Sequence, residues 1–274
     1  TRYAQGIIHG GTKYALTGKL TASAEAVGKM PGIWRACLQG EGEIDLRGVQ
    51  VLSQHQYMWS TSSLTSRLSG FFASHVMKSR TRALERHERP VVFQHKDFRG
   101  QVYQLDEVVL DTASVVHAMA EPQHAAIFRY SPDTLSISLN TDTATLRWQQ
   151  GGQEYALQTR QIVLCAGQGN AQLLQKLGYQ QPQMQTRPLH MVMLRGMRDA
   201  LYAHCLGAST VPRITVTSHP DTAGGWVWYL GGQLAEEGVQ RDAAQQIDAA
   251  RAEMTALFPW LDFSDTQWAT LRID

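Results

Sequence analysis

The 274-residue sequence has almost no net charge and no long apolar run. Its 25 Lys and Arg residues are balanced by 24 Asp and Glu residues, which leaves a formal charge of +1. A near-neutral chain offers no electrostatic field that would attract nucleic acid or an anionic membrane. Its apolar runs fall far short of the roughly 18 residues that a membrane-spanning helix needs. We therefore expect no nucleic-acid partner and no transmembrane segment.

Cysteine is scarce and gives no pattern. The three cysteines, Cys37, Cys165 and Cys205, are odd in number and widely spaced, and no Cys-x-x-Cys pair occurs. This spacing argues against a disulfide framework and against a thiolate metal site, and it favours a reducing compartment, the cytoplasm. Ten histidines are present, but none stands in His-Glu-x-x-His spacing, so no metal site is predicted.

Two common catalytic motifs are also missing. An esterase of the α/β-hydrolase type needs Gly-x-Ser-x-Gly between a strand and a helix, and the nearest stretch, residues 207–211, lacks the second glycine. No lysine follows a glycine-rich loop in the manner of nucleotide-hydrolysing enzymes, which argues against phosphoryl transfer. The adjacent pair His204 and Cys205 fits core packing better than a ligand pair.

The stretch that stands out is Ile-Ile-His-Gly-Gly-Thr-Lys-Tyr, residues 7–14. Paired glycines let a backbone approach a flat ligand closely, because no Cβ intervenes. His9 before them and Lys13 after them bring a titratable group and a fixed positive charge to that approach. The stretch predicts a turn that faces a ligand, although His-Gly-Gly also occurs in ordinary turns.

Hydrophobic periodicity predicts alternating helices and strands in the first part of the chain. A proline-glycine pair at 31–32 interrupts the first helical stretch, and Asp111 with Thr112 marks a strand end and a helix cap. The expected helices are 22–29, 33–39, 64–77 with an exposed basic continuation over 78–89, and 112–119; the expected strands are 49–53, 56–59, 90–95 and 102–110.

The middle of the chain predicts an antiparallel meander that leads into an apolar run. Period-two alternation marks three strands, 135–139, 143–149 and 154–159, after a short strand at 126–130. The run at 162–165 has the composition of a strand buried on both faces. It ends on Ala-Gly-x-Gly before a helix at 171–177, the local geometry of a dinucleotide site. A third glycine is missing, since Gln172 stands there, and tight strand–helix packing is the alternative interpretation.

The last part of the chain predicts three strands and one long helix. The strands are 187–194, 214–217 and 226–230. The helix, 242–258, places Ile247, Ala250, Met254 and Leu257 on one face and ends at Pro259 and Trp260. Residues 271–274 read as a strand that the sequence leaves unfinished. With no Met at position 1, this suggests a fragment of a longer protein.

Three stretches resemble one family. Ile8 to Tyr14 resembles a motif of the FAD-dependent oxidoreductases of the D-amino-acid-oxidase superfamily, most closely the flavin-linked glycerol-3-phosphate dehydrogenase branch, in which an Ile-His-Gly-Gly-x-Arg-Tyr loop passes beside the isoalloxazine ring. Lys13 replaces the arginine, which keeps the charge but loses a bidentate fork for phosphate. Ile162 to Gly167 resembles the strand that returns to the FAD domain, and Leu189 to Met193 the strand that presents a histidine to the active site.

The resemblance implies an α+β or α/β fold, in which an antiparallel-sheet substrate domain is attached to an incomplete Rossmann-like FAD domain. It divides the chain into four parts: 1–48, an FAD-domain part with the flavin-facing loop; 49–110, strands and a helix of the substrate domain; 111–178, an FAD-domain part with the meander and the returning strand; and 179–274, substrate domain. A central fragment of this kind would lack the N-terminal Gly-x-Gly-x-x-Gly segment and the C-terminal part.

The resemblance also implies site residues and chemistry. FAD is the expected cofactor of the intact protein, and its binding residues would be Ile8, His9, Gly10, Gly11, Ala166 and Gly167. The expected reaction is hydride transfer to flavin from a small anionic hydroxy- or amino-substituted substrate such as glycerol 3-phosphate. The implied catalytic residues are His9, His190, Lys13 and Tyr14, with Arg187 and Arg213 as further anion holders.

Several alternatives stay open. The substrate of the same superfamily could be a D-amino acid or a 2-hydroxy acid, or the chain could be a non-catalytic ligand-binding domain. A quinone or another electron acceptor is a further expected partner, and a peripheral contact with the inner membrane is compatible with that acceptor. The fragment by itself is expected to bind FAD weakly and to lack turnover.

Overall fold

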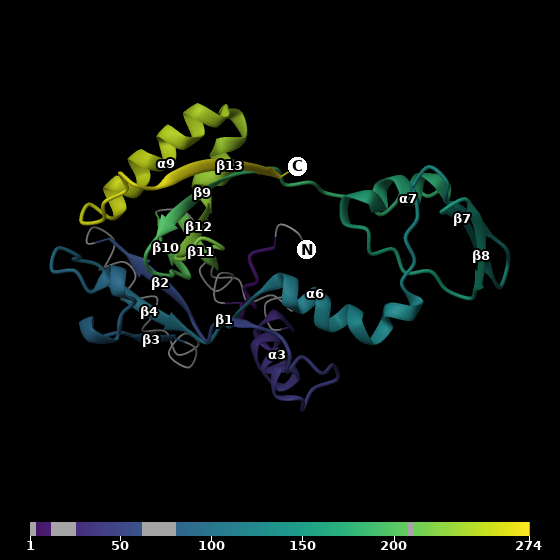
Figure 1. Cartoon of the computed structure of the whole chain (residues 1–274), viewed down its shortest axis with the longest axis horizontal. Helices are drawn as coiled ribbons and strands as arrows, with labels where there is room; N and C mark the ends of the chain where they lie inside the picture. Colours follow the sequence, from purple (N-terminus) through teal and green to yellow (C-terminus); the bar gives the residue numbers. More distant parts are fainter. Residues whose placement is uncertain (1–3, 12–25, 62–80, 208–210, 274) are drawn as a thin grey trace. The chain divides into compact units, whose positions relative to one another are not determined.

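The computed structural model describes residues 4–11, 26–61, 81–207 and 211–273. They form two compact units, which Figure 1 shows. The first unit comprises Thr1–Pro122 and Pro188–Asp274, and the second unit comprises Gln123–Arg187. The four-part division expected from the sequence places its boundaries elsewhere and stays a prediction about domain roles.

An eight-stranded sheet organises the first unit, in the order β13-β9-β12-β11-β10-β2-β4-β3. All neighbours are antiparallel except β10 and β2, which run parallel. The strands are β2 (Gln56–Ser60), β3 (Thr81–Ala83), β4 (Gln101–Leu105), β9 (Leu189–Met197), β10 (Ala203–Cys205), β11 (Ile214–Pro220), β12 (Trp226–Gly231) and β13 (Gln267–Ile273).

A small second sheet carries the N-terminal segment. Strand β1 (Val51–Ser53) pairs antiparallel with β5 (Val109–Leu110). Ile7 forms an antiparallel bridge with Val109, and the amide of Leu110 donates to the carbonyl of Gly6 at 2.9 Å. Residues 6–8 therefore run along β5 and are held there by backbone hydrogen bonds.

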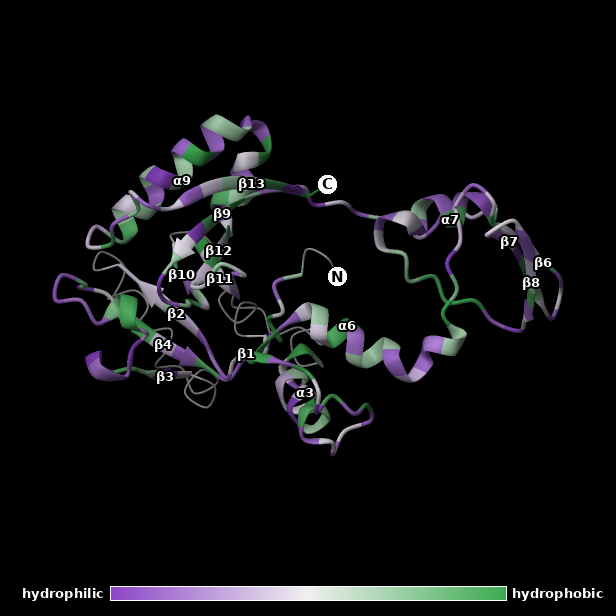
Figure 2. Cartoon of the chain, viewed as in Figure 1, coloured by the Kyte–Doolittle hydropathy of each residue, from purple (hydrophilic) through white to green (hydrophobic). Residues whose placement is uncertain are grey.

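Four α-helices complete the described part of the first unit: α3 (Met30–Gln39), α6 (Thr112–Ala120), α8 (Gln233–Glu237) and α9 (Ala243–Leu257). Hydrophobic and hydrophilic residues alternate along α9 (Figure 2), because one stripe of this helix packs on the sheet. The helix starts at Asp242, whose carboxylate accepts the amide of Gln245 while the Gln245 side chain accepts the amide of Asp242, a capping box.

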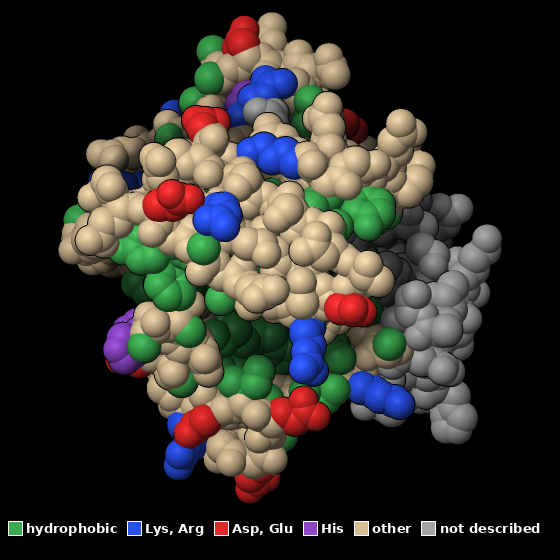
Figure 3. Space-filling view, turned by 90° about the vertical axis from the view of Figure 1, so that its right-hand side faces the viewer, with side chains coloured by type: hydrophobic (Ala, Val, Ile, Leu, Met, Phe, Trp, Pro, Cys, Tyr) green, Lys and Arg blue, Asp and Glu red, His purple; other side chains and the backbone are tan. Residues whose placement is uncertain are grey.

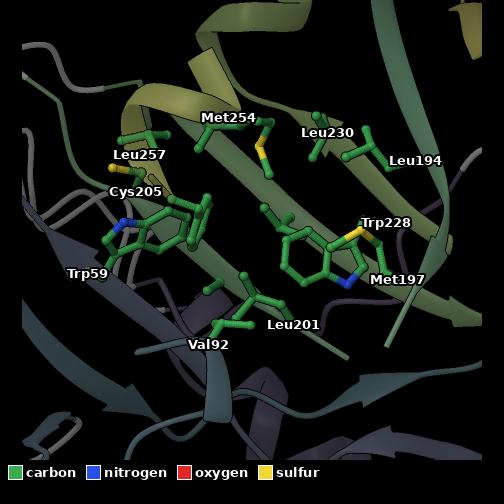
Figure 4. Packing of buried hydrophobic residues seen from close by; sticks show 14 of the residues in the cluster. Trp59, Val92, Leu194, Met197, Leu201, Cys205, Trp228, Leu230, Met254 and Leu257 are labelled. Atoms are coloured by element: carbon green, nitrogen blue, oxygen red, sulfur yellow. The ribbon is translucent and has the colours of Figure 1, made fainter. Parts of the chain in front are cut away.

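The main core lies between the first face of the large sheet and α9. Because side chains alternate along a strand, Leu194, Trp228 and Val216 share this face, where they meet Met254 and Leu257 of the helix (Figure 4). Trp228, Leu194 and Met254 are fully buried. Each such side chain contributes about 1.5–3 kcal/mol of hydrophobic stabilisation.

The opposite, second face of the sheet is polar at several positions. Thr215, Thr217 and His204 alternate with core residues on β10 and β11 and so point away from α9. All three are buried. A buried polar face must be packed against something other than a plain apolar layer, and it is the natural place to look for a site.

The second unit is a three-stranded antiparallel meander followed by a short helix. Its strands, in the order β6-β7-β8, are β6 (Ser136–Leu139), β7 (Ala144–Gln150) and β8 (Gln153–Thr159), and its α-helix is α7 (Asn170–Lys176). Trp148 and Tyr155 stack on this meander, and Phe128 meets the ring of Trp148 edge to face.

On the face that Figure 3 presents, basic and acidic side chains lie close to one another, so this face has no field of one sign. The described surface pairs include Arg147 with Glu154 and Arg35 with Asp106. Exposed ion pairs of this kind contribute about 0–1 kcal/mol each to the free energy of unfolding, and they do not indicate a binding partner.

Much of the sequence prediction is confirmed. The mixture of α and β, the predominantly antiparallel sheet, the meander, the strands around residues 51–60, 189–197, 214–220 and 226–231, and the capped helices α6 and α9 form where they were expected. The three cysteines are free. The attachment to a Rossmann-like FAD domain stays a proposal, and the expected helix over 64–77 lies outside the described residues.

Three predicted strands do not form as expected. The stretch 90–95 contains a 3-10 helix, Val91–Phe93, which buries Val92 and Phe93 in the core instead of pairing them. The stretch 126–130 has no regular structure, and its first residue ends the 3-10 helix Glu121–Ala126. The predicted strand 102–110 is divided into β4 and β5, because the chain leaves one sheet at Asp106 and joins the other at Val109.

The apolar run at 162–165 is also not a strand. Val163 is 74% exposed, and no described strand pairs with this run. A strand buried on both faces needs neighbours at its edges and layers above and below it, and the second unit described by itself provides neither. The 3-10 helix Gly167–Gly169 and α7 do follow, as the predicted turn and helix require.

Two helix predictions need correction. The basic stretch 78–89 is not a helix where it is described, since Thr81–Ala83 is an edge strand paired with β4 and Arg86–Glu88 is a 3-10 helix capped by Glu85. Pro31 does not interrupt α3 but stands in its first turn, where a missing N–H costs nothing. Residues 22–25 of the expected first helix lie outside the described part.

The capping box of α9 gives a test of the fold. Replacing Asp242 with Ala removes the acceptor for the Gln245 amide and should lower the free energy of unfolding by about 0.5–2 kcal/mol. Urea denaturation followed by circular dichroism measures this. The control is Asp248→Ala in the exposed middle of the same helix, which should change stability by less than about 0.5 kcal/mol. Equal losses in the two variants would contradict the assigned cap.

Candidate functional site

The predicted His-Gly-Gly turn lies at the end of the N-terminal segment, directly after its pairing with β5. The amide of Ile8 donates to the carbonyl of Val108 at 2.9 Å, and the turn begins at the next residue. His9 is exposed, whereas Gly10 and Gly11 are buried. The backbone of the turn is thus fixed against β5 while the imidazole stays accessible.

Glu107 holds this turn. Its side chain is only 4% exposed, its Oε1 accepts the amide of Gly10 at 2.9 Å, and its Oε2 lies 3.4 Å from Nδ1 of His9. A Cβ on Gly10 would stand 3.2 Å from the Pro31 side chain and 3.4 Å from Glu107. Gly11 has φ +83°, a conformation that favours glycine. A side chain would be tight at Gly10 because of packing and strained at Gly11 because of the backbone conformation.

The turn contacts the second face of the large sheet through two histidine rings. The rings of His9 and His204 stack with their centroids 6.1 Å apart and their planes 18° from parallel. His204 Nδ1 lies 3.0 Å from Thr215 Oγ1 on the neighbouring strand. Two polar contacts, Glu107 with His9 and His204 with Thr215, are thus joined by the stacked rings of His9 and His204.

A cavity of about 400 Å³ lies on the same face of the large sheet as His204 and Thr215, and we name it the sheet pocket. This volume suits a small organic ligand. Residues of the N-terminal segment, of α6 and of four neighbouring strands form its wall: Ala4, Gln5, Thr112, Met191, Met193, His219, Tyr229 and Leu271. The wall is mixed: Ala4, Met191, Met193 and Leu271 are apolar, whereas Gln5, Thr112, His219 and Tyr229 can form hydrogen bonds.

His219 is the titratable histidine of the sheet pocket. Its ring meets the ring of Tyr229 edge to face, with the centroids 5.0 Å apart. Burial lowers the pKa of His219 below its usual value, and the nearby Asp111 carboxylate opposes this only in part. A neutral imidazole at the wall of a pocket can accept a proton from a bound molecule.

A second cavity, of about 310 Å³, lies on the other side of the N-terminal segment. We name it the segment pocket. Residues 4–9 form one wall, and helices α3 and α6 form the other with Trp34, Val115 and Val116. Ala4, Gln5 and Thr112 line both pockets. The N-terminal segment is therefore the partition between two cavities.

His190, a predicted catalytic residue, lies on the other face of the sheet. It is 4% exposed, and its Nδ1 lies 3.0 Å from the carbonyl of Gly238. Its own carbonyl accepts the side-chain amide of Gln246 on α9. These contacts favour a packing role, because they direct His190 away from the sheet pocket. Its catalytic role stays a prediction.

The other predicted residues are placed as follows. Ile8, His9, Gly10 and Gly11 are brought together in the turn, whereas Lys13 and Tyr14 lie outside the described residues. Ala166 and Gly167 are exposed in the second unit, and nothing tests their predicted contact with a cofactor.

The predicted anion-holding roles of Arg187 and Arg213 stay predictions. Arg213 forms an ion pair with Glu253, and the sheet pocket has neither of the two arginines in its wall.

Glu107, His204 and His219 were missed by the sequence reasoning. Glu107 stands beside Asp106, before the apolar residues 108–110, and the sequence does not show which of the two carboxylates is buried. The alternation of His204 with two core residues on β10 could have separated it from Cys205. His219 had no such signal, because the face of β11 is set by pairing with distant strands.

The described residues contain no cluster of three His, Cys, Asp or Glu side chains suited to a metal ion. None of the described helices is long and apolar enough to cross a membrane.

The chain is similar to known flavoproteins, although no family model matches it. It is 46% identical to the probable FAD-dependent oxidoreductase PA4991 of Pseudomonas aeruginosa over 281 residues, which cover 99% of this chain and 68% of the relative. The crystal structure of PA4991 superposes with a TM-score of 0.80 and 39% identity, and the match covers 99% of this chain and 66% of that one. The chain therefore spans about two thirds of the length of this relative.

A more distant similarity concerns the fold alone. Iminodiacetate oxidase (IdaA) from Chelativorans sp. BNC1 superposes with a TM-score of 0.55 at 14% identity, over 98% of this chain and 72% of that one.

Glu107 gives a test of the site. Glu107→Ala should lower the free energy of unfolding by about 1–3 kcal/mol, because a buried amide loses its acceptor. Glu107→Gln keeps an oxygen for Gly10 and should cost less. The neighbouring Asp106, whose side chain is 67% exposed in its ion pair with Arg35, provides the control. Asp106→Ala should cost at most about 1 kcal/mol in the same urea titration. A larger loss for Asp106→Ala than for Glu107→Ala would refute the positioning role.

Proposed function

Because this chain belongs to the family of FAD-dependent oxidoreductases that includes PA4991, we propose that it binds the substrate of a flavin-dependent oxidation. The substrate is a small molecule with a hydroxyl or amino group on the carbon that is oxidised. The observation that carries the proposal is the sheet pocket, whose wall combines apolar side chains with a histidine of lowered pKa and with Ala4 and Gln5 of the N-terminal segment.

The described residues fit the ring end of FAD. Gly10 and Gly11 have no Cβ atom that would stand between a flat ring and the backbone. Ile8 and His9, directly before them, line the apolar segment pocket. We propose that Ile8, His9, Gly10 and Gly11 hold the ring. The cofactor-binding role predicted for Ala166 and Gly167 stays part of the proposal. When bound, the flavin supplies the acceptor for a hydride from the substrate.

The protein must bind the substrate and remove one proton from it. We assign proton acceptance to Nδ1 or Nε2 of His219, since burial keeps this imidazole neutral near neutral pH. Met191, Met193 and Leu271 exclude water from the apolar part of the substrate. His9, held by Glu107, positions the turn. The roles expected for Lys13, Tyr14 and His190 remain part of the proposal as anion holder, hydrogen-bond donor and second base.

The narrower substrate assignment rests on the resemblance alone. Glycerol 3-phosphate is proposed because of the Ile-His-Gly-Gly stretch, with Lys13 as the phosphate contact. A D-amino acid or a 2-hydroxy acid is the alternative within the superfamily, and a quinone is the proposed electron acceptor.

The function is tested by the absorbance spectrum of the full-length protein. We expect flavin bands between 350 and 500 nm, a range typical of oxidised flavin, and their bleaching under anaerobic conditions by a substrate. The substrate panel is glycerol 3-phosphate, D-amino acids, 2-hydroxy acids and secondary amines. A protein that shows no flavin bands after reconstitution with FAD would refute the proposal.

The titration of His219 predicts the pH dependence of the reaction. The base must be neutral, and its pKa lies below the usual 6.5. Activity should therefore be complete at neutral pH and should fall only as the pH drops below 6.5. Measurement of kcat/KM against pH with the full-length enzyme checks this.

A variant isolates the contribution of His219. His219→Gln should lower kcat about 10²–10⁴-fold, the usual range for a general base, and should abolish the acidic limb. His87→Gln, at an exposed histidine of a 3-10 helix, is the control and should leave both unchanged. An acidic limb that persists in His219→Gln would assign the base to another residue.

A further inference from the structure

Besides Ser60 on β2, four side chains on or beside the second face of the large sheet have buried polar atoms without a hydrogen-bond partner in the described structure. They are the Nε2 of Gln5, both amide atoms of Gln56, the hydroxyl of Tyr202 and the Oγ1 of Thr217. Buried polar atoms in native proteins nearly always have a partner. Four such groups in one region therefore indicate that a molecule other than the chain satisfies them.

Three of these side chains stand in one row across the sheet. Ala203 pairs with Tyr57 on one side and with Val216 on the other, so the preceding residue, Tyr202, lies between Gln56 and Thr217. The backbone supports this register, because the amide of Tyr57 donates to the carbonyl of Tyr202 at 2.9 Å. Adjacent strands lie about 4.8 Å apart, which places the three side chains side by side on one face.

The row leads into the sheet pocket. Thr217 pairs with Tyr229, which lines the pocket, and His219 lies two residues further along the same strand. Gln5 also lines the pocket, and its Nε2 lies 3.6 Å from the position that a Cβ on Gly231 would occupy, over the neighbouring strand. The four groups thus extend from the pocket wall toward β2.

We propose that Gln5, Gln56, Tyr202 and Thr217 form an inner subsite of the sheet pocket that binds an uncharged polar group, such as an amide or a hydroxyl. This rests on the proposed function in one respect: the group belongs to the end of the substrate that does not react. Two amides, a phenol and an aliphatic hydroxyl offer donors and acceptors together, which suits a ligand that also has both.

The chemistry of the subsite disfavours an anion. None of its four side chains carries a positive charge, and burying an unpaired carboxylate or phosphate is costly. Burial raises the pKa of Tyr202, so its phenol stays neutral and keeps its proton to donate. The subsite therefore selects the uncharged end of a substrate, whatever group is oxidised at His219.

The chain offers a matched pair of variants at adjacent positions. Thr217→Val keeps the shape of the side chain and removes a hydroxyl that has no partner. Ser218→Ala removes a buried hydroxyl on the first face. This hydroxyl has two hydrogen-bond partners, the amide of Leu201 at 2.7 Å and the carbonyl of Leu201 at 2.9 Å. Loss of the Ser218 hydroxyl should lower Tm by several degrees, whereas loss of the Thr217 hydroxyl should leave Tm equal or higher.

The experiment uses the full-length, flavin-loaded protein and four probes at matched concentration and ionic strength: acetamide, glycerol, acetate and inorganic phosphate. We expect acetamide and glycerol to raise Tm more than acetate and phosphate do. Thr217→Val and Tyr202→Phe should abolish this difference, and Ser218→Ala should retain it. With a substrate that bleaches the flavin, the two subsite variants should raise KM about tenfold, which corresponds to a loss of about 1.4 kcal/mol.

The outcomes distinguish a failure of the proposed subsite from a failure of the proposed function. Loss of the probe effect in Thr217→Val with Tm preserved supports the subsite, even where no substrate is found. Unchanged probe effects in both variants would overturn it, although the flavin bands and their bleaching remained normal. A lower Tm in Thr217→Val and Tyr202→Phe would also overturn it, because these hydroxyls would then bind structural water.

Discussion

The buried carboxylate of Glu107 is the constraint on which the site depends. A carboxylate that is almost completely removed from water must be surrounded by hydrogen-bond donors, or its burial would be prohibitively costly. In this chain the amide of Gly10, 97 residues away, donates to it, and Nδ1 of His9 lies 3.4 Å from its other oxygen. Glu107 lies between β4 of the large sheet and β5 of the small sheet. Its contact with Gly10 therefore holds the turn at the junction of the two sheets.

The two faces of the large sheet have different roles: the first packs the core and the second lines the sheet pocket. On the first face, Trp228, Leu194 and Met254 form an apolar core with α9, and even His190 is used there as a link to Gly238. On the second face, period-two alternation turns every other residue toward the N-terminal segment. Strand pairing therefore brings residues from β9, β11 and β12 together at one pocket, although they are distant in sequence.

Local signals were sufficient for most elements and for the turn, but not for the pocket. Asp242 and Asp111 specify their helix starts through contacts within three residues, and His-Gly-Gly marked a close backbone approach that the packing of Gly10 explains. His219 and Thr217 become site residues only through the register of β11 with β12. Composition likewise misassigned Val163, because an apolar run specifies burial only when a partner surface is present.

The polar groups of the second face are a cost that the first face can offset. Each buried polar atom left without a partner lowers stability by about 1–3 kcal/mol, whereas a fully buried large apolar side chain contributes about 1.5–3 kcal/mol. A few core residues such as Trp228 and Phe258 therefore balance the row formed by Gln56, Tyr202 and Thr217. Valine, phenylalanine and leucine would fill the same positions without that cost. Polar side chains at these positions make physical sense where a ligand supplies the missing hydrogen bonds, and proteins depart from local packing rules chiefly at such sites.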